Sequence, residues 1–314
     1  MKILVTGGAG FIGSHVCDRL LSLGHDVVCV DDFNDYYDPD FKERNIKQAL
    51  KNSKYTLYRA DITDLSTLKD IFAREKPEKI IHLAARAGVR YSISHPELYV
   101  RVNVLGTLNL LELAKEYKIK SFVFGSSSSV YGANKKVPFS EEDRVDDPIS
   151  PYAATKKAAE ELCHAYHHLY GLKITCLRFF TVYGPRGRPD MVIYLFSKAI
   201  TDGKPIKRFG NGKTKRDYTF ISDIVDGIIA ALDKELDFEI VNLGDSNTVE
   251  LNYLISLIEN AIGKKAKIEQ SPLQPGDVPI TYADISKAKK LLKYEPKVKI
   301  EQGIPLFVEW FNKR

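Results

Sequence analysis

Three Tyr-x-x-x-Lys pairs are candidates for acid–base chemistry, namely Tyr131/Lys135, Tyr152/Lys156 and Tyr194/Lys198. In a helix this spacing puts the phenol and the ammonium one turn apart on the same face. A neighbouring positive charge favours the phenolate and lowers the pKa of the tyrosine from its reference value of about 10. Such a tyrosine can act as a general base beside a hydride acceptor.

The context of Tyr152 distinguishes its pair from the other two. Tyr152 begins an alanine-rich helical segment, after a predicted strand that ends in the serines 126–129. A serine hydroxyl at a strand end can bond the same substrate oxygen that the tyrosine deprotonates. This context favours Tyr152 and Lys156. We interpret Tyr131, in the turn after that strand, and Tyr194 as structural residues.

The N-terminal segment carries a glycine-rich turn, residues 7–13 (GGAGFIG), between a predicted strand and a predicted helix. Such glycines allow a tight turn, close approach to a pyrophosphate and close packing of the helix, whose N-terminus faces the phosphates. Asp31 lies 18 residues beyond Gly13, at the end of the second strand. Its carboxylate would accept bonds from ribose hydroxyls and repel a 2′-phosphate. This context favours an NAD site over a purely structural glycine turn, and NAD over NADP.

Other predicted cofactor positions follow the next strands. Asp61 and Ile62 come after the third strand and are interpreted as adenine contacts, while Ala84 and Ala85 give the small surface that a cofactor needs at the end of the fourth. The predicted cofactor-binding residues are Gly7, Gly10, Phe11, Ile12, Gly13, Asp31, Asp32, Asp61, Ile62, Leu83, Ala84, Ala85, Asn103, Tyr152 and Lys156.

The elements that must position these residues alternate through the first half of the chain. The predicted strands are 2–6, 26–30, 56–60, 79–84, 121–126 and 173–179, and the predicted helices are 11–23, 64–75, 97–117 and 152–170. Near-continuous apolar strands alternating with helices indicate a parallel sheet covered on both faces. The predicted fold class is α/β, a doubly wound parallel sheet of the Rossmann type with a smaller C-terminal substrate-binding lobe.

After Arg178 the alternation gives way to turn-rich stretches and shorter helices, predicted at 223–232, 250–261 and 284–292. We therefore predict an NAD-binding domain over 1–178 and a mainly substrate-binding lobe over 179–314. The segment 238–243 is expected to return as a strand to the main sheet. Because no repeat or low-complexity linker separates the two parts, we expect them to pack around a cleft.

Composition restricts the class of partner. Lys and Arg number 46 against 41 Asp and Glu, and the resulting net charge of +5 is scattered, which argues against nucleic acid. No apolar run is long enough to span a bilayer, and the N-terminus leaves no room for a signal peptide. Cysteines 17, 29, 163 and 176 form no CxxC pair. These features predict a cytoplasmic protein in a reducing compartment, without membrane contact.

A histidine-rich helix face offers the alternative of a metal site. Cys163, His164, His167 and His168 have spacings that suit metal ligation. No glutamate stands between them in the HExxH manner, and hydride chemistry needs no metal. We interpret them as surface histidines and predict no metal.

The chain resembles the extended short-chain dehydrogenase/reductase family across essentially its whole length. The resemblance is carried by the stretches TGGAGFIGSH, HLAA, SSSSVYG, SPYAATK, RFFTVYGPRGRPDM and KRDYTFISDIV. Within the family, segments 31–38 (DDFNDYYD), 87–92 (AGVRYS) and 274–279 (QPGDVP) are most similar to those of epimerases that act on UDP-glucuronate.

The resemblance implies a nucleotide-sugar 4-epimerase that interconverts UDP-glucuronate and UDP-galacturonate through a 4-keto sugar, with tightly bound NAD. It implies Ser127, Tyr152 and Lys156 as the catalytic group, and a homodimer formed through the helices 97–117 and 152–170. The predicted substrate-binding residues are Arg90, Ser128, Ser129, Thr181, Arg188, Phe209, Arg216 and Asp277. Thr181 and Arg188 would contact the sugar and its carboxylate, and the last three the UDP.

Two positions differ from the family pattern. Arg86 stands in place of a Gln and Arg186 in place of a Trp. Both are expected to add positive charge near the sugar, which fits an acidic sugar.

Other activities remain open: a UDP-glucose/UDP-galactose 4-epimerase, a nucleotide-sugar dehydratase or decarboxylase, and a non-enzymatic NAD-binding regulator. Dehydratases of the family carry Asp-Glu directly after the active-site Ser or Thr, and its decarboxylases carry Glu there too. This chain has Ser128 and Ser129, which favours epimerisation. Regulators of this type usually lack the Tyr or the Lys, and both are present here.

Overall fold

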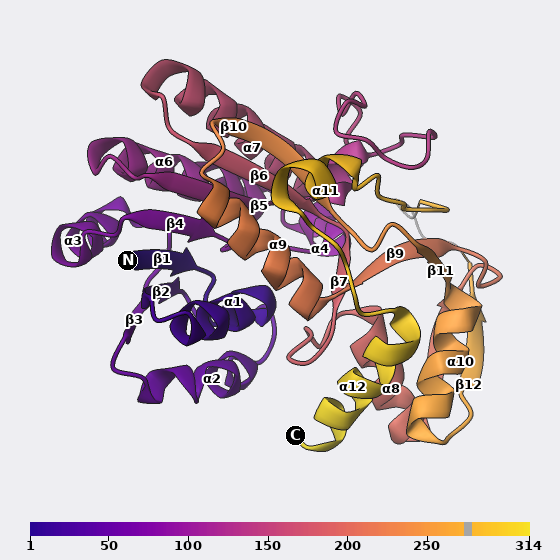
Figure 1. Ribbon diagram of the computed structural model, residues 1–314. Helices are drawn as coiled ribbons and strands as arrows, with labels where there is room; N and C mark the ends of the chain where they lie inside the picture. The colour runs from indigo at the N-terminus through magenta and orange to yellow at the C-terminus, as the bar shows by residue number, and fades with distance from the viewer. Residues whose placement is uncertain (273–277) are drawn as a thin grey trace.

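The computed structural model describes residues 1–272 and 278–314 (Figure 1). Its strands are β1 (Lys2–Thr6), β2 (Asp26–Asp31), β3 (Tyr55–Arg59), β4 (Lys79–His82), β5 (Ser121–Ser127), β6 (Ile174–Phe179), β7 (Thr181–Tyr183), β8 (Pro205–Phe209), β9 (Lys215–Phe220), β10 (Phe238–Leu243), β11 (Thr248–Glu250) and β12 (Lys267–Ser271). Its helices are α1 (Phe11–Ser22), α2 (Asp40–Ile46), α3 (Leu65–Glu75), α4 (Val89–Ser94), α5 (Pro96–Tyr99), α6 (Gly106–Glu116), α7 (Pro151–Tyr170), α8 (Val192–Thr201), α9 (Ile221–Lys234), α10 (Leu251–Ile262), α11 (Ser286–Leu292) and α12 (Ile300–Asn312).

The main sheet is parallel throughout. Among the described residues seven strands form it, in the order β10-β6-β5-β4-β1-β2-β3. The strand order reverses between β1 and β4, and open α/β sheets bind ligands in the crevice beyond the carboxyl ends of the strands at such a point. The predicted doubly wound parallel sheet is confirmed, and the segment 238–243 pairs with β6 as its edge strand.

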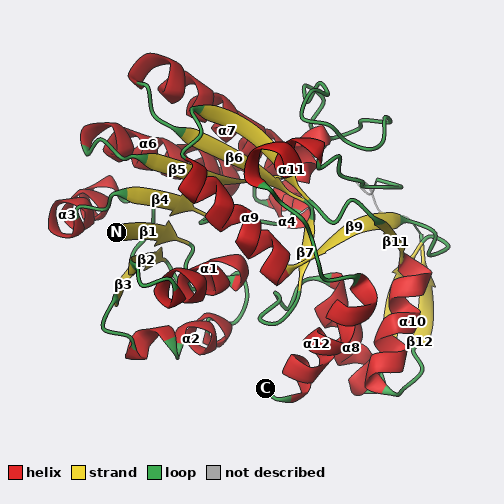
Figure 2. Ribbon diagram, in the orientation of Figure 1, coloured by secondary structure: helices red, strands yellow, loops and turns green. Residues whose placement is uncertain are grey.

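Helices cover both faces of this sheet (Figure 2). On one face α3, α6 and α7 pack through Phe72, Leu110 and Cys163, which belong to one buried cluster with Ile80 of β4. On the other face α1 and α9 pack against the sheet within a second cluster. This double coverage explains why the strands read as continuous apolar runs rather than as alternating ones.

The predicted helix 97–117 is wrong as a single α-helix. The structure divides it into α5, a π-helical stretch (Val100–Leu105) and α6. Asn103, in the π-helical stretch, is buried, and its side chain donates to the Arg86 carbonyl at 3.0 Å and to Thr155 Oγ1 at 3.1 Å. Wider π turns often mark functional positions in helices. The other predicted elements of the first half lie within one or two residues of the observed ones.

The C-terminal part contains elements that the sequence analysis did not predict. A three-stranded sheet has the order β11-β9-β7, and β8 pairs with β12. Helices α8, α10 and α12 pack together beside them. The strands are only three to six residues long and carry no clear alternation. Pro305 inside α12 also argues against a helix there when the sequence is read alone.

Candidate active site

A cavity of about 420 Å³ lies at the crevice between β1 and β4. The glycine-rich turn, the ends of β2, β4 and β5, the start of α7 and the segment 179–191 contribute to its lining. The predicted site residues that line it are Gly7, Gly10, Phe11, Ile12, Gly13, Asp31, Asp32, Asp61, Ile62, Leu83, Ala84, Ala85, Ser127, Ser128, Ser129, Tyr152, Lys156, Thr181 and Arg188. One cavity therefore brings the predicted cofactor, catalytic and sugar residues together.

The glycine-rich turn is too tight for side chains. Gly7 has φ +70°, and a Cβ there would lie 2.7 Å from the backbone nitrogen of Ala84, while a Cβ on Gly13 would overlap the Gly7 carbonyl. Gly10 caps α1 without any side-chain hydrogen bond. The first amides of α1 have no acceptor within the helix and belong to residues that line the cavity. Such a turn fits the pyrophosphate of a dinucleotide.

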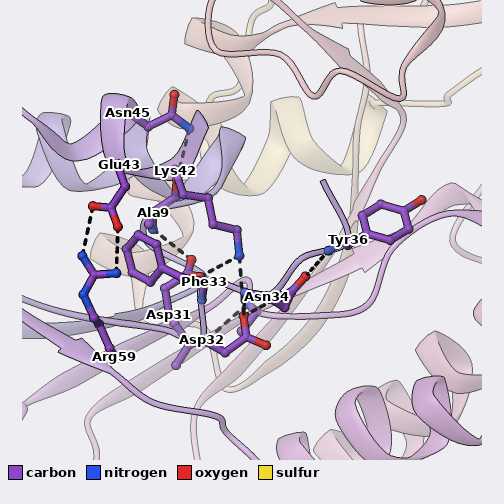
Figure 3. A network of polar contacts seen from close by, with 12 residues as sticks. Ala9, Asp31, Asp32, Phe33, Asn34, Tyr36, Lys42, Glu43, Asn45 and Arg59 are labelled. Atoms are coloured by element: carbon purple, nitrogen blue, oxygen red, sulfur yellow. Dashed lines mark hydrogen bonds and ion pairs between the residues drawn. The ribbon is translucent and has the colours of Figure 1, made fainter. Parts of the chain in front are cut away.

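Asp31 lies in a dense network at the end of β2 (Figure 3). Its Oδ2 accepts from the Ala9 amide at 3.1 Å, and its Oδ1 accepts from the Phe33 amide at 3.0 Å and from Lys42 Nζ at 2.8 Å. Both Asp31 and Lys42 are buried. The pair with Lys42 offsets the charge of Asp31 and so weakens the predicted repulsion of a 2′-phosphate.

Asp32 is the more accessible of the two acids. It accepts from the amide and the side chain of Asn34, and its carboxylate lies 3.5 Å from Lys42 and 3.7 Å from Arg86. The Arg86 guanidinium is thus directed to the end of β2. The expectation that Arg86 adds charge near the sugar stays a prediction, because Arg86 lines the cavity while its guanidinium lies 3.7 Å from Asp32.

Helix α7 presents the predicted acid–base pair. Ser150 caps it by accepting from the Ala153 amide at 3.1 Å, and Pro151 occupies its first position, where a missing N–H costs nothing. This start places Tyr152 in the first turn. Lys156 follows one turn later and donates from Nζ to the Gly125 carbonyl of β5 at 2.7 Å. Ser127, at the end of β5, lies close enough to the Tyr152 phenol to lower its pKa, and its Oγ accepts from the Ser129 amide at 3.1 Å.

Burial opposes charge on both members of the pair. Burial raises the pKa of Tyr152, while Ser127 and the positive charge of Arg188 lower it by less. The protein alone therefore raises the pKa of Tyr152, and the expected lowering would need the positive ring of bound NAD. Burial also lowers the pKa of Lys156 to about 8, against the opposing charge of Glu160. The protein surroundings favour the neutral forms of both groups.

The other two Tyr-x-x-x-Lys pairs have structural contacts. The Tyr131 hydroxyl is buried and donates to Asn242 Oδ1 at 2.7 Å. Tyr194 is buried between Phe41 and Phe307, and Lys198 pairs with Asp202. Neither tyrosine lines the main cavity. Both agree with the structural interpretation.

Arg188 meets an acidic partner within its own turn. Its Nε donates to Asp190 Oδ1 at 2.9 Å and its Nη2 to Oδ2 at 2.5 Å, so the two side chains form a fork. The Tyr36 hydroxyl also donates to Asp190 at 3.2 Å, and the guanidinium lies over the Tyr36 ring. Arg188 therefore pairs with Asp190 and also lines the cavity.

Some predicted substrate residues lie away from the cavity lining. The Arg90 guanidinium of α4 packs over the Phe209 ring at 4.9 Å, which brings these two residues together. Arg216 on β9 donates to the Lys215 carbonyl, and Asp277 falls outside the described residues. Asn103 lies behind the lining, bound to Arg86.

The expectation for Arg186 is wrong. Arg186 has φ +63°, pairs with Asp18 of α1 at 2.8 Å and does not line the cavity. Since Asp18 engages its guanidinium, Arg186 stabilises the turn against α1 rather than adding charge at the sugar.

The sequence analysis missed several residues of the site. Lys42 of α2 and the rings of Tyr36 and Tyr37 line the cavity, as does Met191. Apart from Asp31 and Asp32, segment 31–38 enters the sequence analysis only as a family signal. Lys42 follows Asp31 by 11 residues across a loop, and no local pattern shows that its side chain returns to β2.

The histidine-rich face of α7 serves packing. The rings of His164 and His167 contact Phe238, and Cys163 is buried. Within residues 1–272 and 278–314, no cluster of three or more metal-ligating side chains occurs. In the same part of the chain, no helix combines the length and apolarity needed to cross a bilayer.

Comparison with protein families and known proteins adds independent findings. The family model of GDP-mannose 4,6 dehydratase matches residues 4–306. The UDP-glucuronate 4-epimerase of Thermodesulfobacterium geofontis is 51% identical over 308 residues, which cover 98% of this chain and 95% of that protein.

Two solved structures are similar over the whole chain. The UDP-glucuronic acid 4-epimerase of Bacillus cereus, solved with UDP-glucuronic acid and NAD, has a TM-score of 0.93 and 39% identity, covering 100% of this chain and 99% of that one. The UDP-glucose 4-epimerase of Thermotoga maritima, solved with UDP-glucose, has a TM-score of 0.92 and 36% identity, with the same coverage of both chains.

Proposed function

The chain belongs to the GDP-mannose 4,6 dehydratase family of extended short-chain dehydrogenases/reductases, and from this premise we propose that it is an NAD-dependent UDP-glucuronate 4-epimerase. It would interconvert UDP-glucuronate and UDP-galacturonate. The Thermodesulfobacterium geofontis and Bacillus cereus epimerases are similar to this chain over nearly its full length, and both are named for UDP-glucuronate or UDP-glucuronic acid. They support this assignment over a UDP-glucose 4-epimerase.

One observation carries the proposal. Ser127, Tyr152 and Lys156 line the same cavity as the glycine-rich turn, and the two positions after Ser127 are the serines 128 and 129. Dehydration or decarboxylation in this family uses a carboxylic acid at these positions. The acids that line this cavity are Asp31, Asp32 and Asp61, which lie at or just after the ends of β2 and β3 on the cofactor side. The arrangement supports proton exchange at one hydroxyl and no further acid–base step.

The chain's own residues would act as follows. Ser127 holds the sugar 4-hydroxyl and the Tyr152 phenol together, and Tyr152 takes the hydroxyl proton and later returns it. Lys156, fixed by the Gly125 carbonyl, supplies the positive charge that favours the phenolate. When bound, NAD would supply a positive ring beside Tyr152 and a reversible hydride acceptor for carbon 4 of the sugar. Rotation of the 4-keto sugar before Tyr152 returns the proton inverts the centre.

The substrate would lie across both parts of the chain. We propose that 1–178, with β10, holds NAD, and that 179–314 contributes most of the UDP-sugar contacts. Thr181 and Arg188 line the cavity beside the serines and would bind the sugar carboxylate. Arg90 and Phe209, which pack together, are proposed at the UDP with Arg216 and Asp277.

We also propose a cytoplasmic homodimer formed through α6, α7 and the π-helical stretch. Val100, Leu105, Leu169 and Tyr170 on these elements are 43–64% exposed, and a partner chain on this side would bury them. Analytical ultracentrifugation tests it. A concentration-independent monomer would contradict the dimer, and charged substitutions at Leu105 and Leu169 should dissociate it.

The function is tested by incubating the purified protein with UDP-glucuronate, UDP-glucose and dTDP-glucose and identifying the products by NMR. UDP-galacturonate from UDP-glucuronate is the expected main product. UDP-galactose formed faster from UDP-glucose would favour the second epimerase activity. A 4-keto-6-deoxy sugar or a UDP-pentose as the main product would refute epimerisation.

A further inference from the structure

A buried ion pair lies behind the catalytic group and joins α7 to β6. Glu160 Oε1 accepts from Arg178 Nε at 2.9 Å, and Oε2 accepts from Arg178 Nη2 at 2.8 Å. Both side chains are 1% exposed. The two parallel hydrogen bonds fix the relative orientation of the helix and the strand, because a guanidinium and a carboxylate meet in one plane.

The same carboxylate reaches the strand that carries Ser127. Ser126 Oγ donates to Glu160 Oε1 at 2.6 Å, next to Ser127 in the chain. On the preceding residue, the Gly125 carbonyl accepts from Lys156 at 2.7 Å. Lys156 and Glu160 are one turn apart on α7. The end of β5 is therefore held at two successive residues by two successive turns of the catalytic helix.

Stability alone does not account for this pair. Burying two charges costs solvation energy, and apolar residues of similar volume often replace a buried ion pair without loss. Arg178 Nη1 lacks a hydrogen-bond partner in the described structure, and the guanidinium packs over the Tyr131 ring at 4.9 Å. The buried pair therefore points to a role in the electrostatics of the site or in fixing the geometry of α7 and the sheet.

We propose that Glu160 and Arg178 are positioning residues for the acid–base chemistry of Tyr152. The Glu160 carboxylate keeps Lys156 in its ammonium form, and the fork with Arg178 holds the end of β5 so that Ser127 meets the Tyr152 phenol. This inference rests on the proposed function, in which Ser127, Tyr152 and Lys156 are the catalytic group.

The electrostatic part follows from the groups around Lys156. Burial lowers the pKa of Lys156 to about 8, and Glu160 is the strongest of the groups that oppose this lowering. The titratable groups that act on Lys156 are Glu160 and Cys163 from α7 and Cys176 from β6, and Lys156 in turn acts on His82 from β4. The cations that face Glu160 are Arg178 at 2.8 Å and Lys157 at 3.8 Å. Among the groups that act on Lys156, Glu160 is the carboxylate, so its removal should release Lys156 to the neutral form at lower pH.

Two matched variants of the NAD-loaded enzyme separate charge from shape. Glu160→Gln removes the charge and keeps the side-chain length, and the alkaline limb of its kcat–pH profile should move down by about one pH unit. Arg178→Lys keeps the charge and loses the planar fork, so kcat should fall by about tenfold while the limb stays in place. Glu235→Gln is the control, since Glu235 pairs with Lys79 of the same sheet outside the cavity lining.

A second readout does not depend on turnover. Ionisation of the Tyr152 phenol can be followed by ultraviolet difference absorption, with Tyr152→Phe subtracted. In Glu160→Gln the phenol should titrate at higher pH than in the wild type, because less ammonium faces it. If Glu160→Gln does not fold, the variant Glu160→Gln/Arg178→Gln removes both buried charges. A displacement in the same direction but smaller is expected, because losing the Arg178 cation offsets part of the loss of Glu160.

The inference is overturned if Glu160→Gln, or the double variant in its place, leaves the alkaline limb and the Tyr152 titration at their wild-type pH values. A similar displacement in Glu235→Gln also overturns it, because the effect would then be a general loosening of the sheet. A wild type without epimerase activity would refute the proposed function instead, and the phenol titration would still decide the role of Glu160.

Discussion

Lys42 Nζ lies 2.8 Å from Asp31 Oδ1, and both side chains are buried at the end of β2. This pair changes the electrostatics expected for the ribose of the cofactor. A free carboxylate would reject a 2′-phosphate, whereas a neutralised one rejects it less. Arg86, 3.7 Å from Asp32, adds a second cation beside the same acids. We still expect NAD to bind more tightly than NADP, but by a margin that Lys42 reduces.

Lys42→Met should therefore sharpen cofactor selectivity. The variant leaves Asp31 unpaired, so NADP should lose about tenfold more affinity than NAD. Breaking a buried ion pair on one side also costs about 3–5 kcal/mol of unfolding free energy. Calorimetric titration of the nucleotide-free protein with both cofactors measures the ratio. Lys51→Met, at an exposed lysine after α2, is the control. An unchanged NADP/NAD ratio in Lys42→Met would contradict the role of Lys42.

Tyr152→Phe should remove the acid–base group and little else. The ring packs edge-on against Tyr99 at 6.1 Å, a contact that phenylalanine keeps. We expect kcat to fall by about 10²–10⁴ with NAD content and fold retained. Tyr131→Phe is the matched control, since it removes the hydrogen bond to Asn242 and should cost about 1 kcal/mol of stability without comparable loss of turnover. A loss below about tenfold in Tyr152→Phe would show that another group is the base.

A buried hydrogen-bond chain makes stability depend on pH through His82. The Ala84 amide donates to Thr6 Oγ1 at 3.2 Å, and Thr6 Oγ1 lies 2.7 Å from His82 Nδ1. On the other side Thr107 Oγ1 donates to the Asn103 carbonyl, so it accepts from His82 Nε2 at 3.0 Å. With Thr6 donating to Nδ1, the chain of hydrogen bonds fits the neutral imidazole. Burial and the charge of Lys156 lower the pKa of His82 from 6.5 to about 3.

Because the folded-state pKa of His82 is lowered, the unfolded chain takes up the proton first. The free energy of unfolding that neutral His82 contributes is fully present above pH 6.5 and is lost as the pH falls toward 3. Between pH 6.5 and about pH 5 the loss should be roughly 2 kcal/mol. Denaturant unfolding at several pH values measures it. His82→Gln should flatten this dependence, while the exposed His168→Gln should keep it. Equal slopes in the wild type and His82→Gln would refute the assignment.

The parts of the fold that sequence predicts are those with local signals. The strands of the main sheet are apolar runs, and α7 begins at a Ser-Pro cap. The glycines of residues 7–13 mark a turn that is too tight for side chains. Contacts between distant side chains have no such signal. Glu160 and Arg178 are 18 residues apart on a helix and a strand, and only the packing of α7 on β6 shows that they meet. The π turn at Asn103 likewise depends on Arg86 and Thr155, which lie elsewhere in the chain.

Arg188 is placed to bind the carboxylate of the sugar. Oxidation of carbon 4 in a glucuronate gives a β-keto acid, which is prone to lose carbon dioxide. An epimerase must hold the carboxylate so that its breaking bond stays out of line with the keto group. Arg188 lines the cavity, and its fork with Asp190 shows that the guanidinium already binds a carboxylate in the planar, two-pronged manner. A substrate carboxylate would compete with Asp190 or share the guanidinium with it.

Arg188→Ala should therefore weaken turnover of UDP-glucuronate selectively. We expect kcat/KM to fall by about 100-fold for UDP-glucuronate and by less than about threefold for UDP-glucose, which has no carboxylate to bind. Some decarboxylated 4-keto pentose should also appear, and NMR of the products detects it. Arg186→Ala is the matched control, because Arg186 belongs to the same turn but pairs with Asp18 outside the cavity lining. A proportionate fall for both sugars in Arg188→Ala, or no fall for either, would show that Arg188 serves only its pair with Asp190.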